Sequence, residues 1–352
     1  MSRTETEAVA TSVDISVVVC TYSSTRVRGL EDLVGALRGQ TLVPAQIVVV
    51  VDHNDELLDR LRASLTDVMV IPNSGTRGLS GARNSGVENA TGDIVAFIDD
   101  DAVPSPDLLE RHAAGYLDQA VVGVGGAAHP AWEATPPRWF PAEFGWVVGC
   151  SYKGLPTAPS SIRNFIGCNM SFRRTVFDSV GGFLTGLGRV DLVPAGCEET
   201  EFCIRLSRRL PAGKLWFDPG ASVRHSVPAV RATWSYFRSR CYMEGRSKAR
   251  VARLVGASRG LKSERSYIVK TLPGGVVEAV TQQFRGDVAG LARACAIVAG
   301  LAITSAGYLV GTVELWTIRR SLASADTVRS SKTPRPALAQ PLTQTAEERS
   351  RA

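Results

Sequence analysis

Four short apolar runs, separated by segments with helical spacing, constrain the fold of this chain more than any other feature. The runs are almost continuously aliphatic, which is typical of strands covered on both faces. They lie at Ile15–Tyr22, Gln46–Asp52, Val68–Pro72 and Asp93–Asp101. Helices are predicted between them at Arg28–Leu37, Leu57–Leu65 and Gly81–Ala90. This alternation predicts an α/β fold with a doubly wound, mainly parallel sheet.

Three of these predicted strands end in polar residues. The first ends at Thr21 and Tyr22, the second at Asp52, and the fourth at the triplet Asp99–Asp101. In open α/β sheets, ligands bind beyond the carboxyl ends of the strands. The strand ends therefore predict a binding site at this edge of the sheet.

The triplet itself indicates a metal. Adjacent carboxylates repel one another, which is unfavourable unless a cation is present. In an extended chain Asp99 and Asp101 point to one side and Asp100 to the other. Two oxygen ligands on one side suit a Mg²⁺ or Mn²⁺ ion that bridges two phosphates. The alternative is an acidic loop that caps a helix beginning near Pro106.

Several motifs in order along the chain resemble the family 2 glycosyltransferases of GT-A fold. They are VVVCTYS, VVVVD, SGARNSGVENATGDIVAFIDDDAVP, GCNMSFRRTVFDSVGGF and CEETEFCIRL. The similarity covers about Val13 to Pro228. The order and spacing of these motifs together are more specific than any single motif. The resemblance implies an inverting, metal-dependent transfer of a sugar from a nucleotide diphosphate to an acceptor.

The resemblance also implies roles for donor-side residues. Thr21, Tyr22 and Asp52 would contact the nucleoside, and Arg83 would contact the base or the diphosphate. The triplet would complete the donor site, with Asp99 near the ribose and metal, Asp100 beside the nucleotide sugar, and Asp101 as metal ligand. A structural alternative for Arg83 is an ion pair with Asp93 or Glu88.

Glu198 and Glu199 occupy the position at which the family places its catalytic carboxylate, often as Glu-Asp. An inverting transfer needs a general base beside the acceptor hydroxyl, and we expect Glu199 rather than Glu198 to be that base. The alternative is that both acids stabilise the first turn of a helix through its dipole. A helix is predicted at Glu199–Arg209, followed by a strand at Lys214–Gly220 that ends in a turn.

His225 is one of four histidines in the chain. In related GT-A enzymes, a histidine after the acceptor region completes the metal site, so His225 is a candidate ligand of the metal or the diphosphate. The alternative is a buried or surface imidazole without a ligand. The Gln-x-x-Arg-Trp motif of processive polysaccharide synthases is missing from the sequence, and the resemblance does not extend to those enzymes.

The remaining segments define the expected domains. Residues 1–12 are predicted to be a disordered tail, and 13–230 a catalytic domain with a nucleotide-binding half (13–128) and an acceptor half (129–230). Residues 129–164 are rich in Pro and aromatics, which indicates either a lid over the acceptor site or a surface segment held by packed aromatics. A basic and apolar helical extension (231–320) and a disordered tail (321–352) follow.

Charge and hydropathy indicate where the protein acts. The net charge is +6, but Arg231–Lys270 alone holds eleven Lys or Arg against two Glu. Together with the uncharged run Ala294–Val313, this favours the inner face of a cell membrane over nucleic acid, for which no recognition fold is evident. That run is long enough to span a bilayer or to lie on its surface. Seven scattered cysteines and a polar N-terminus predict a cytoplasmic, reducing environment.

Two other classes of protein compete with the glycosyltransferase. A sugar nucleotidyltransferase would need a glycine-rich, basic loop after the first strand, where this chain has only Gly29. A membrane-tethered module could hold a structural cation in the acidic triplet without catalysis. The expected partners are a nucleotide-diphosphate sugar and a glycan, glycolipid or polyprenyl-phosphate acceptor, in the synthesis of cell-envelope glycans or glycolipids.

Overall fold

A nine-stranded sheet organises the protein in the computed structural model, which describes residues 13–188, 196–256 and 262–331. Eight strands follow the order β3-β2-β1-β4-β8-β6-β9-β5, and β7 pairs with β9. The strands are β1 (Ile15–Thr21), β2 (Gln46–Val51), β3 (Met69–Pro72), β4 (Ile94–Ile98), β5 (Ala102–Pro104), β6 (Val121–Trp132), β7 (Ser160–Ser161), β8 (Asn169–Arg173) and β9 (Lys214–Val227).

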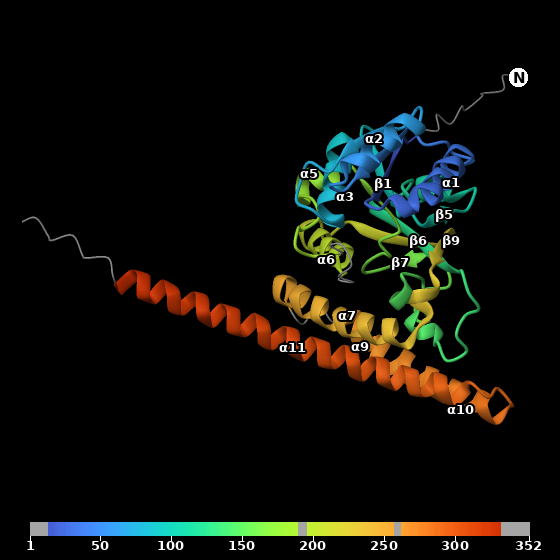
Figure 1. Ribbon diagram of the computed structural model, residues 1–352, viewed down its shortest axis with the longest axis vertical. Helices are drawn as coiled ribbons and strands as arrows, with labels where there is room; N and C mark the ends of the chain where they lie inside the picture. Colours follow the sequence, from blue (N-terminus) through green and yellow to red (C-terminus); the bar gives the residue numbers. More distant parts are fainter. Residues whose placement is uncertain (1–12, 189–195, 257–261, 332–352) are drawn as a thin grey trace, which may run out of the picture. The chain divides into compact units, whose positions relative to one another are not determined.

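The helices follow the same chain order (Figure 1). They are α1 (Val27–Arg38), α2 (Asp55–Ser64), α3 (Leu79–Asn89), α4 (Leu108–Gly115), α5 (Thr175–Val180), α6 (Glu198–Arg209), α7 (Trp234–Val255), α9 (Lys262–Ser266), α10 (Leu272–Phe284) and α11 (Gly290–Ser331). Short 3₁₀ segments lie at η1 (Ser24–Arg26), η2 (Ala142–Val148) and η3 (Ala229–Ala232), and a π-helical turn lies at η4 (Tyr267–Thr271).

The predicted α/β fold is confirmed, and the sheet is wholly parallel only in its first half. Strands β3, β2, β1 and β4 are all parallel neighbours. Beyond β4 the sheet is mixed, because β8 is antiparallel to both β4 and β6, while β9 is parallel to β6 and antiparallel to β5 and β7. Each predicted strand and helix of the first hundred residues is present, with ends that differ by three residues at most.

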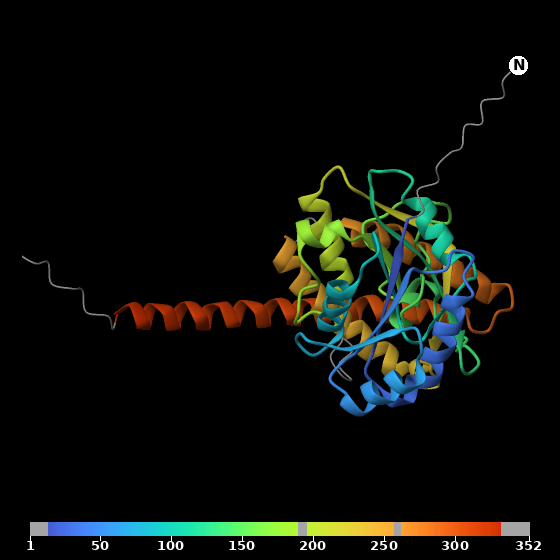
Figure 2. The ribbon, with the colours of Figure 1, turned by 90° about the horizontal axis from the view of Figure 1, so that it is seen from above.

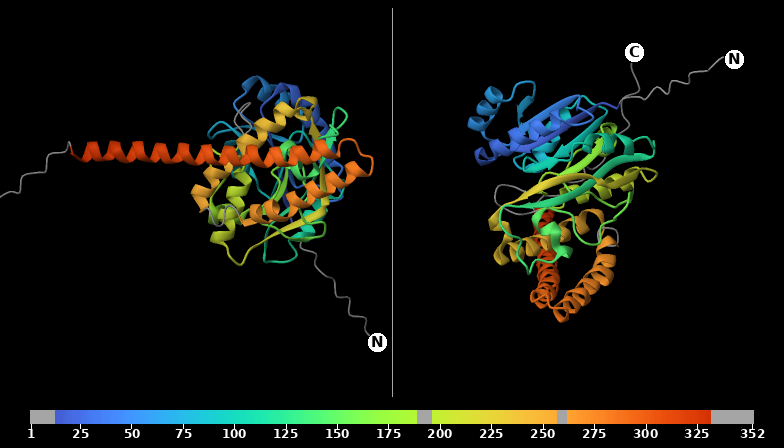
Figure 3. Two further views of the ribbon diagram at one scale, coloured as in Figure 1. Left: turned by 90° about the horizontal axis from the view of Figure 1, so that it is seen from below. Right: turned by 90° about the vertical axis from the view of Figure 1, so that its right-hand side faces the viewer.

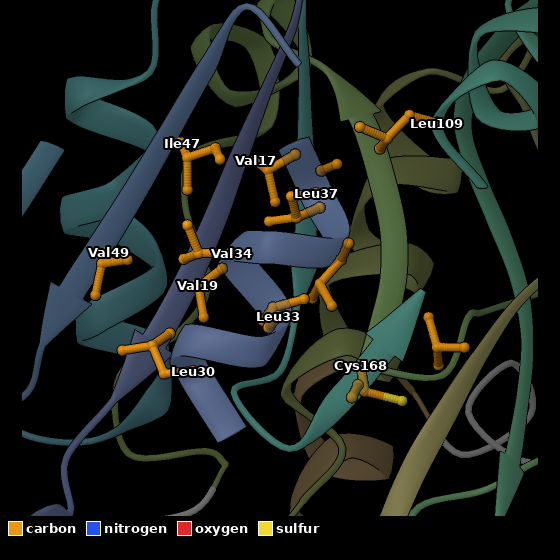
Figure 4. Close-up of a cluster of buried hydrophobic side chains, with 14 of the residues drawn as sticks. Val17, Val19, Leu30, Leu33, Val34, Leu37, Ile47, Val49, Leu109 and Cys168 are labelled. Atoms are coloured by element: carbon orange, nitrogen blue, oxygen red, sulfur yellow. The ribbon is translucent and has the colours of Figure 1, made fainter. Parts of the chain in front are cut away.

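Two apolar layers cover the sheet. On one face α1, α2 and α4 pack their leucines against alternate strand residues, as Figure 4 shows for Leu30, Leu33 and Leu37 beside Val17 and Val19. On the other face α3, α5 and α6 pack around a cluster of phenylalanines. In Figures 1 and 2, α1 accordingly lies on the opposite side from α5 and α6. All seven cysteines are free thiols.

The strand predicted at Lys214–Gly220 is longer than the sequence indicated. The expected turn is an irregularity inside β9, where the register with β6 shifts between Gly126 and Ala127. The backbone N–H of Gly220 donates to Asp218 Oδ1 at 2.8 Å, which closes this local loop. The chain then resumes pairing as far as Val227. A side chain at Gly126 would collide with the carbonyl of Ala221, so glycine is required there.

Up to Thr312, the helices after β9 form a third layer beside the sheet, away from α1 and α2 (Figures 1 and 3). Within the compact unit that ends at Thr312, α7 and the first part of α11 meet at glycines. A Cβ at Gly245 would lie 2.0 Å from the Thr304 carbonyl oxygen, and one at Gly307 would lie 2.1 Å from that of Tyr242. The two backbones therefore approach too closely for any larger residue.

The C-terminal part of the chain corrects one prediction. Residues 321–331 were predicted to be disordered, but α11 continues through Ser331. The segment RRSLASADTVRSS holds Ala, Leu and Arg, which favour helix, and has no Pro or Gly. The expected tails at 1–12 and 332–352 lie outside the described residues.

Gly290–Thr317 is apolar and long enough to cross a membrane, with a mean hydropathy of 1.8.

Candidate functional site

The ends of β1, β2 and β4 lie side by side, as the sequence predicted. Thr21 is level with Val51 of β2, and the N–H of Asp52 donates to the Thr21 carbonyl at 2.8 Å. On the other side of β1, the pairing of Val18 with Phe97 brings Asp99 and Asp100 level with the end of β1. Three predicted site segments therefore share one edge of the sheet.

Asp99, Asp101 and His225 form a candidate metal centre. One ligand atom from each side chain lies within 4.8 Å of the other two. The extension of β9 explains the meeting, because His225 pairs with Ala102 of β5, the residue after Asp101. In the sequence, the imidazole of His225 lies far beyond the two carboxylates, after β8 and α6. The three residues predicted as metal ligands are thus brought together by the fold.

An ion pair joins two members of this trio, His225 and Asp101. His225 Nε2 lies 3.2 Å from Asp101 Oδ1. Burial alone would lower the pKa of His225, but hydrogen bonds with Asp101 and Cys150 raise it to about 10. Burial would likewise raise the pKa of Asp101, yet His225, Arg26 and Arg231 hold it well below its usual range. Asp101 is therefore an anion that a divalent cation can bind without first displacing its proton.

Asp100 points to a different set of partners. It is 2% exposed and forms an ion pair with Arg26, whose guanidinium also lies 3.3 Å from Asp101. Burial raises the pKa of Asp100 to about 6, against the opposing charge of Arg26. The predicted extended conformation of the triplet is wrong, because Asp99–Ala102 forms a turn in which the Ala102 N–H donates to the Asp99 carbonyl at 3.0 Å. The turn still directs Asp99 and Asp101 toward His225, whereas Asp100 pairs with Arg26.

Asp52 and Tyr22 border the same space. Asp52 accepts hydrogen bonds from Asn73 Nδ2 at 2.6 Å and from the Gly78 N–H at 2.9 Å. These bonds attach the end of β2 to the loop that precedes α3. Tyr22 lies beside Arg26, whose guanidinium carbon is 5.5 Å from the ring centroid. The arrangement offers an aromatic ring and a carboxylate beside the metal centre.

Arg83 links the metal centre to the glutamate pair. Its guanidinium lies 2.8 Å from Glu198 Oε1 and 3.4 Å from Asp99 Oδ1, and it donates to the Gly167 carbonyl at 3.0 Å. The alternative ion pair with Asp93 or Glu88 is wrong, because the buried guanidinium pairs with Glu198 and Asp99 instead. Arg83 is only 1% exposed, yet it lines the cavity described below.

Glu198 and Glu199 begin α6 and differ in environment. Glu198 is 4% exposed and paired with Arg83. Glu199 is partly exposed, lines the cavity, and accepts a hydrogen bond from Thr200 Oγ1 at 3.1 Å. Burial, and then the charge of Glu198, raises the pKa of Glu199 to about 8. A carboxyl group tuned to this range is suited to proton transfer near neutral pH.

One cavity of about 570 Å³ contains all ten residues predicted for the site. At one end, which we call the strand-end half of the cavity, it is lined by residues that follow β1, β2 and β4, and Glu198 and Glu199 lie between the two ends. At the other end it is lined by α7, α9 and α11, which we call the helical half of the cavity. It also takes in parts of the aromatic segment 129–164, namely Phe144, Trp146, Tyr152, Asn164 and neighbours.

The aromatic segment 129–164 is packed. Phe144, Val147, Val148 and Cys150 are buried together with Phe237 of α7, and Trp139 and Phe140 pack against this cluster. Tyr267 Oη donates to the Glu143 carbonyl, which attaches the segment to η4. The segment therefore forms a wall of the cavity held by aromatics.

Several residues in the site were not predicted. Arg26 follows β1 and Arg231 lies on η3, and both face Asp101. Arg231 is the first residue of the basic stretch, whose charge alone was the signal. Arg163, Lys248 and Glu264 line the helical half, and their ion pairs join segments up to 101 residues apart. Only the tertiary structure could reveal that pairing.

Comparison with known proteins identifies the family. The model of "Glycosyl transferase family 2" matches residues 16–181. The chain is 37% identical over 238 residues to a glucosyl-dolichyl phosphate glucuronosyltransferase of Haloferax volcanii, covering 66% of this chain and 76% of that one. It is 28% identical over 260 residues to succinoglycan biosynthesis protein ExoM of Rhizobium meliloti, covering 71% and 78%.

A solved structure has the same fold. Mannosyltransferase PcManGT from Pyrobaculum calidifontis, determined with GDP-Man and Mn²⁺, superposes with a TM-score of 0.52 at 18% identity, over 87% of this chain and 88% of that one. The level of identity restricts this likeness to the fold. Sequence motifs, family model and curated relatives agree, and the chain belongs to glycosyl transferase family 2 and is a glycosyltransferase.

Proposed function

We propose that this glycosyltransferase is metal-dependent and inverting, and that it transfers a sugar from a nucleotide diphosphate to a hydroxyl of a lipid-linked or glycan acceptor. The single observation that carries the proposal is that Asp99, Asp101 and His225 converge in the same cavity as Glu199. Groups suited to donor binding and to proton transfer thus line one cavity.

The side chains of the candidate metal centre fit a divalent cation. Two carboxylates and one imidazole suit Mn²⁺, and Mg²⁺ accepts the carboxylates as well. Asp101 Oδ1 is buried and lies 3.2 Å from His225 Nε2, so a cation that replaces the imidazole proton would find both ligand atoms together. When bound, the cation would neutralise charge on the leaving diphosphate.

The chain's own residues supply the rest. Thr21, Tyr22 and Asp52 border the space for the nucleoside, and Arg83 places a positive charge between the donor side and Glu198. Glu199 takes the proton of the acceptor hydroxyl as that oxygen attacks the anomeric carbon on the face opposite the diphosphate. A general base in this position contributes about 10²–10⁴-fold in rate.

Nucleotide binding tests the donor site first. Nucleoside diphosphates should raise the melting temperature in the presence of Mn²⁺ and much less without it, because a ligand of the folded state stabilises by mass action. A panel of nucleotide sugars with Mn²⁺ then separates the alternatives. A transferase shows slow donor hydrolysis, a nucleotidyltransferase releases sugar 1-phosphate with pyrophosphate, and a binding module shows no turnover. Either of the last two results would contradict the proposal.

Membrane association is the proposed location, at the inner face of a cell membrane. Large apolar side chains are exposed on α10 and on α11 up to Thr312, namely Val277, Phe284, Leu291, Val298, Leu309 and Val310. Val288, between the two helices, is 72% exposed as well. An exposed apolar surface of this kind, beside basic residues of the 231–270 segment, suits an anionic lipid surface. The glucosyl-dolichyl phosphate relative supports a lipid-linked acceptor.

The domain division also stays a proposal. The nucleotide-binding half at 13–128 holds the parallel strands, and the acceptor half at 129–230 holds β7, β8 and β9. The helical extension from 231 supplies α7, α9 and α11 to the cavity. Catalysis is accordingly expected to need all three parts.

A further inference from the structure

Three basic side chains line the helical half of the cavity: Arg163, Arg240 and Lys248, which we call the cation cluster. Arg163 follows β7, whereas Arg240 and Lys248 lie two turns apart on α7. Their side chains are 22%, 14% and 23% exposed. Cations at such depth are unfavourable unless anions face them.

Two carboxylates face the cluster. Glu244 lies 2.9 Å from Arg240 and 3.3 Å from Lys248. Glu264 lies 2.8 Å from Lys248 and receives two parallel hydrogen bonds from Arg163, at 2.6 and 2.9 Å. These five groups carry three positive and two negative charges. The excess is positive, in contrast to the strand-end half, where the four carboxylates of Asp52 and the triplet Asp99–Asp101 are balanced by Arg26, Arg83, Arg231 and protonated His225.

The cluster lies directly beside the glutamate pair. Glu244 accepts a hydrogen bond from Cys197 Sγ at 3.3 Å, and Cys197 immediately precedes Glu198. A Cβ on Gly196 would lie 3.0 Å from Arg240 Nη2. An anion bound to the cluster would therefore be a close neighbour of an acceptor hydroxyl at Glu199.

Apolar side chains continue the cavity beyond the cluster. Leu272 is buried, and Leu301, Tyr308 and Leu309 of α11 line the same space. Leu309 is 65% exposed, so the cavity reaches the outer, apolar surface of this helix. A ligand that fits both regions carries an anionic group next to a hydrocarbon chain.

We propose that the cation cluster binds the phosphate of a lipid-phosphate acceptor, whose hydrocarbon chain lies along α11, and that Glu264 occupies this phosphate position when the acceptor is absent. The inference rests on the proposed function, because the acceptor's sugar hydroxyl would then meet Glu199. The bidentate contact of Glu264 with Arg163 is the geometry in which a guanidinium also binds phosphate.

Glu264 determines in which direction phosphate affinity should change in each variant. It lies on the short helix α9 and competes with an incoming phosphate for Arg163 and Lys248. Removing its charge should strengthen phosphate binding, whereas removing a cation should weaken it. A network with only a structural role would predict weaker binding, or no change, for both.

The test uses the full-length chain in detergent and farnesyl phosphate as the probe, with the dissociation constant measured by calorimetry. Lys248→Gln should weaken binding at least about tenfold, as expected for loss of a charge-assisted contact. Arg163→Lys keeps the charge but loses the bidentate fork, and should weaken binding by a smaller factor. Glu264→Gln should strengthen binding about threefold or more. Arg250→Gln, an exposed cation on the same helix, should have no effect.

Farnesol and inorganic phosphate distinguish the sources of affinity. Farnesol should bind weakly and equally to all variants, and inorganic phosphate should compete only weakly with the probe. Competition by inorganic phosphate as strong as that of farnesyl phosphate would overturn the lipid assignment. Weaker binding by Glu264→Gln, or unchanged binding by both Lys248→Gln and Arg163→Lys, would overturn the phosphate site.

Failure of the proposed function can be distinguished from failure of this inference by a separate measurement. Each variant is also tested for stabilisation by a nucleoside diphosphate with Mn²⁺, which reports the strand-end half alone. Retained nucleotide stabilisation without farnesyl phosphate binding in the wild type refutes this inference and leaves the transferase proposal standing. The reverse result refutes the proposed donor site.

Discussion

The two halves of the cavity are built in different ways. In the strand-end half, side chains follow directly from β1, β2 and β4, whose positions are fixed by backbone pairing on both sides. In the helical half, side chains from α7, α9 and α11 meet through ion pairs and close glycine contacts. In the first half the carboxylates and cations balance, whereas the second half carries excess positive charge.

This contrast suggests a division of labour. A rigid strand end suits a metal and nucleotide, which need ligands in a fixed geometry. Helices joined by ion pairs can exchange partners, and this suits an acceptor that must enter and leave. Glu198 and Glu199 lie at the boundary, where Arg83 attaches Glu198 to the strand-end half. The predictions below test how independent the two halves are.

The largest effect is expected from Asp101→Asn. This change removes a proposed metal ligand, and a bound cation supplies several kcal/mol of charge stabilisation, so transfer should fall by at least about 10³-fold. Stabilisation by nucleotide with Mn²⁺ should disappear, while farnesyl phosphate binding should persist. Asp118→Asn, an exposed carboxylate paired with Lys214, serves as the control. Mn²⁺-linked stabilisation that survives in Asp101→Asn would contradict the metal assignment.

The glutamate pair should separate chemistry from stability. Glu199→Gln should lower transfer about 10²–10⁴-fold, as expected for loss of a general base, with donor affinity retained. Glu198→Gln leaves Arg83 buried without its closest partner and should lower the free energy of unfolding by about 3–5 kcal/mol. Transfer rates and urea unfolding of both variants decide between these roles. A greater catalytic loss in a stable Glu198→Gln protein would reverse the assignment.

The same contrast explains what the sequence could predict. Strand ends are local features, so apolar runs followed by Thr21, Asp52 and the triplet predict which residues meet at the edge of the sheet. The turn that directs the carboxylates of the triplet was not predicted. His225 was a candidate only through the family resemblance, because its position depends on the continuation of β9 past an irregularity at Pro219. The Arg163–Glu264 pair joins two segments without shared periodicity, so no pattern of residues could indicate it.

The pH dependence of transfer should report Glu199. Because the pKa of this carboxyl is raised to about 8, the base is mostly protonated at neutral pH. The rate should therefore rise up to tenfold per pH unit below about pH 8 and level off above it. Glu199→Gln should show a low rate without this rise. A wild-type rate that is flat between pH 6 and 8 would show that Glu199 does not act as the base.

Protein stability should change in the opposite direction with pH. An unfolded glutamate ionises near pH 4.3, whereas folded Glu199 keeps its proton up to about pH 8. Between these values the folded state binds more protons, so the wild type should lose stability relative to Glu199→Gln as the pH rises. Urea unfolding of the two proteins at pH 5 and pH 8 measures this difference.

The smallest effect concerns membrane binding. It compares the outer surface of the C-terminal helices with the outer surface on the side of the parallel strands. Phe284, at the end of α10, is 86% exposed, and Leu117, after α4 on the strand side, is 80% exposed. If only the C-terminal helices contact lipid, Phe284→Asp should reduce binding to anionic vesicles about tenfold, because burial of a phenylalanine contributes about 1.5–3 kcal/mol. Leu117→Asp should leave vesicle binding unchanged. High salt should weaken binding of both proteins through the basic segment, since exposed charges are screened, but it should not remove the difference between them. Equal vesicle binding by the two variants would mean that α10 does not face the lipid, and its exposed apolar residues would then need another partner.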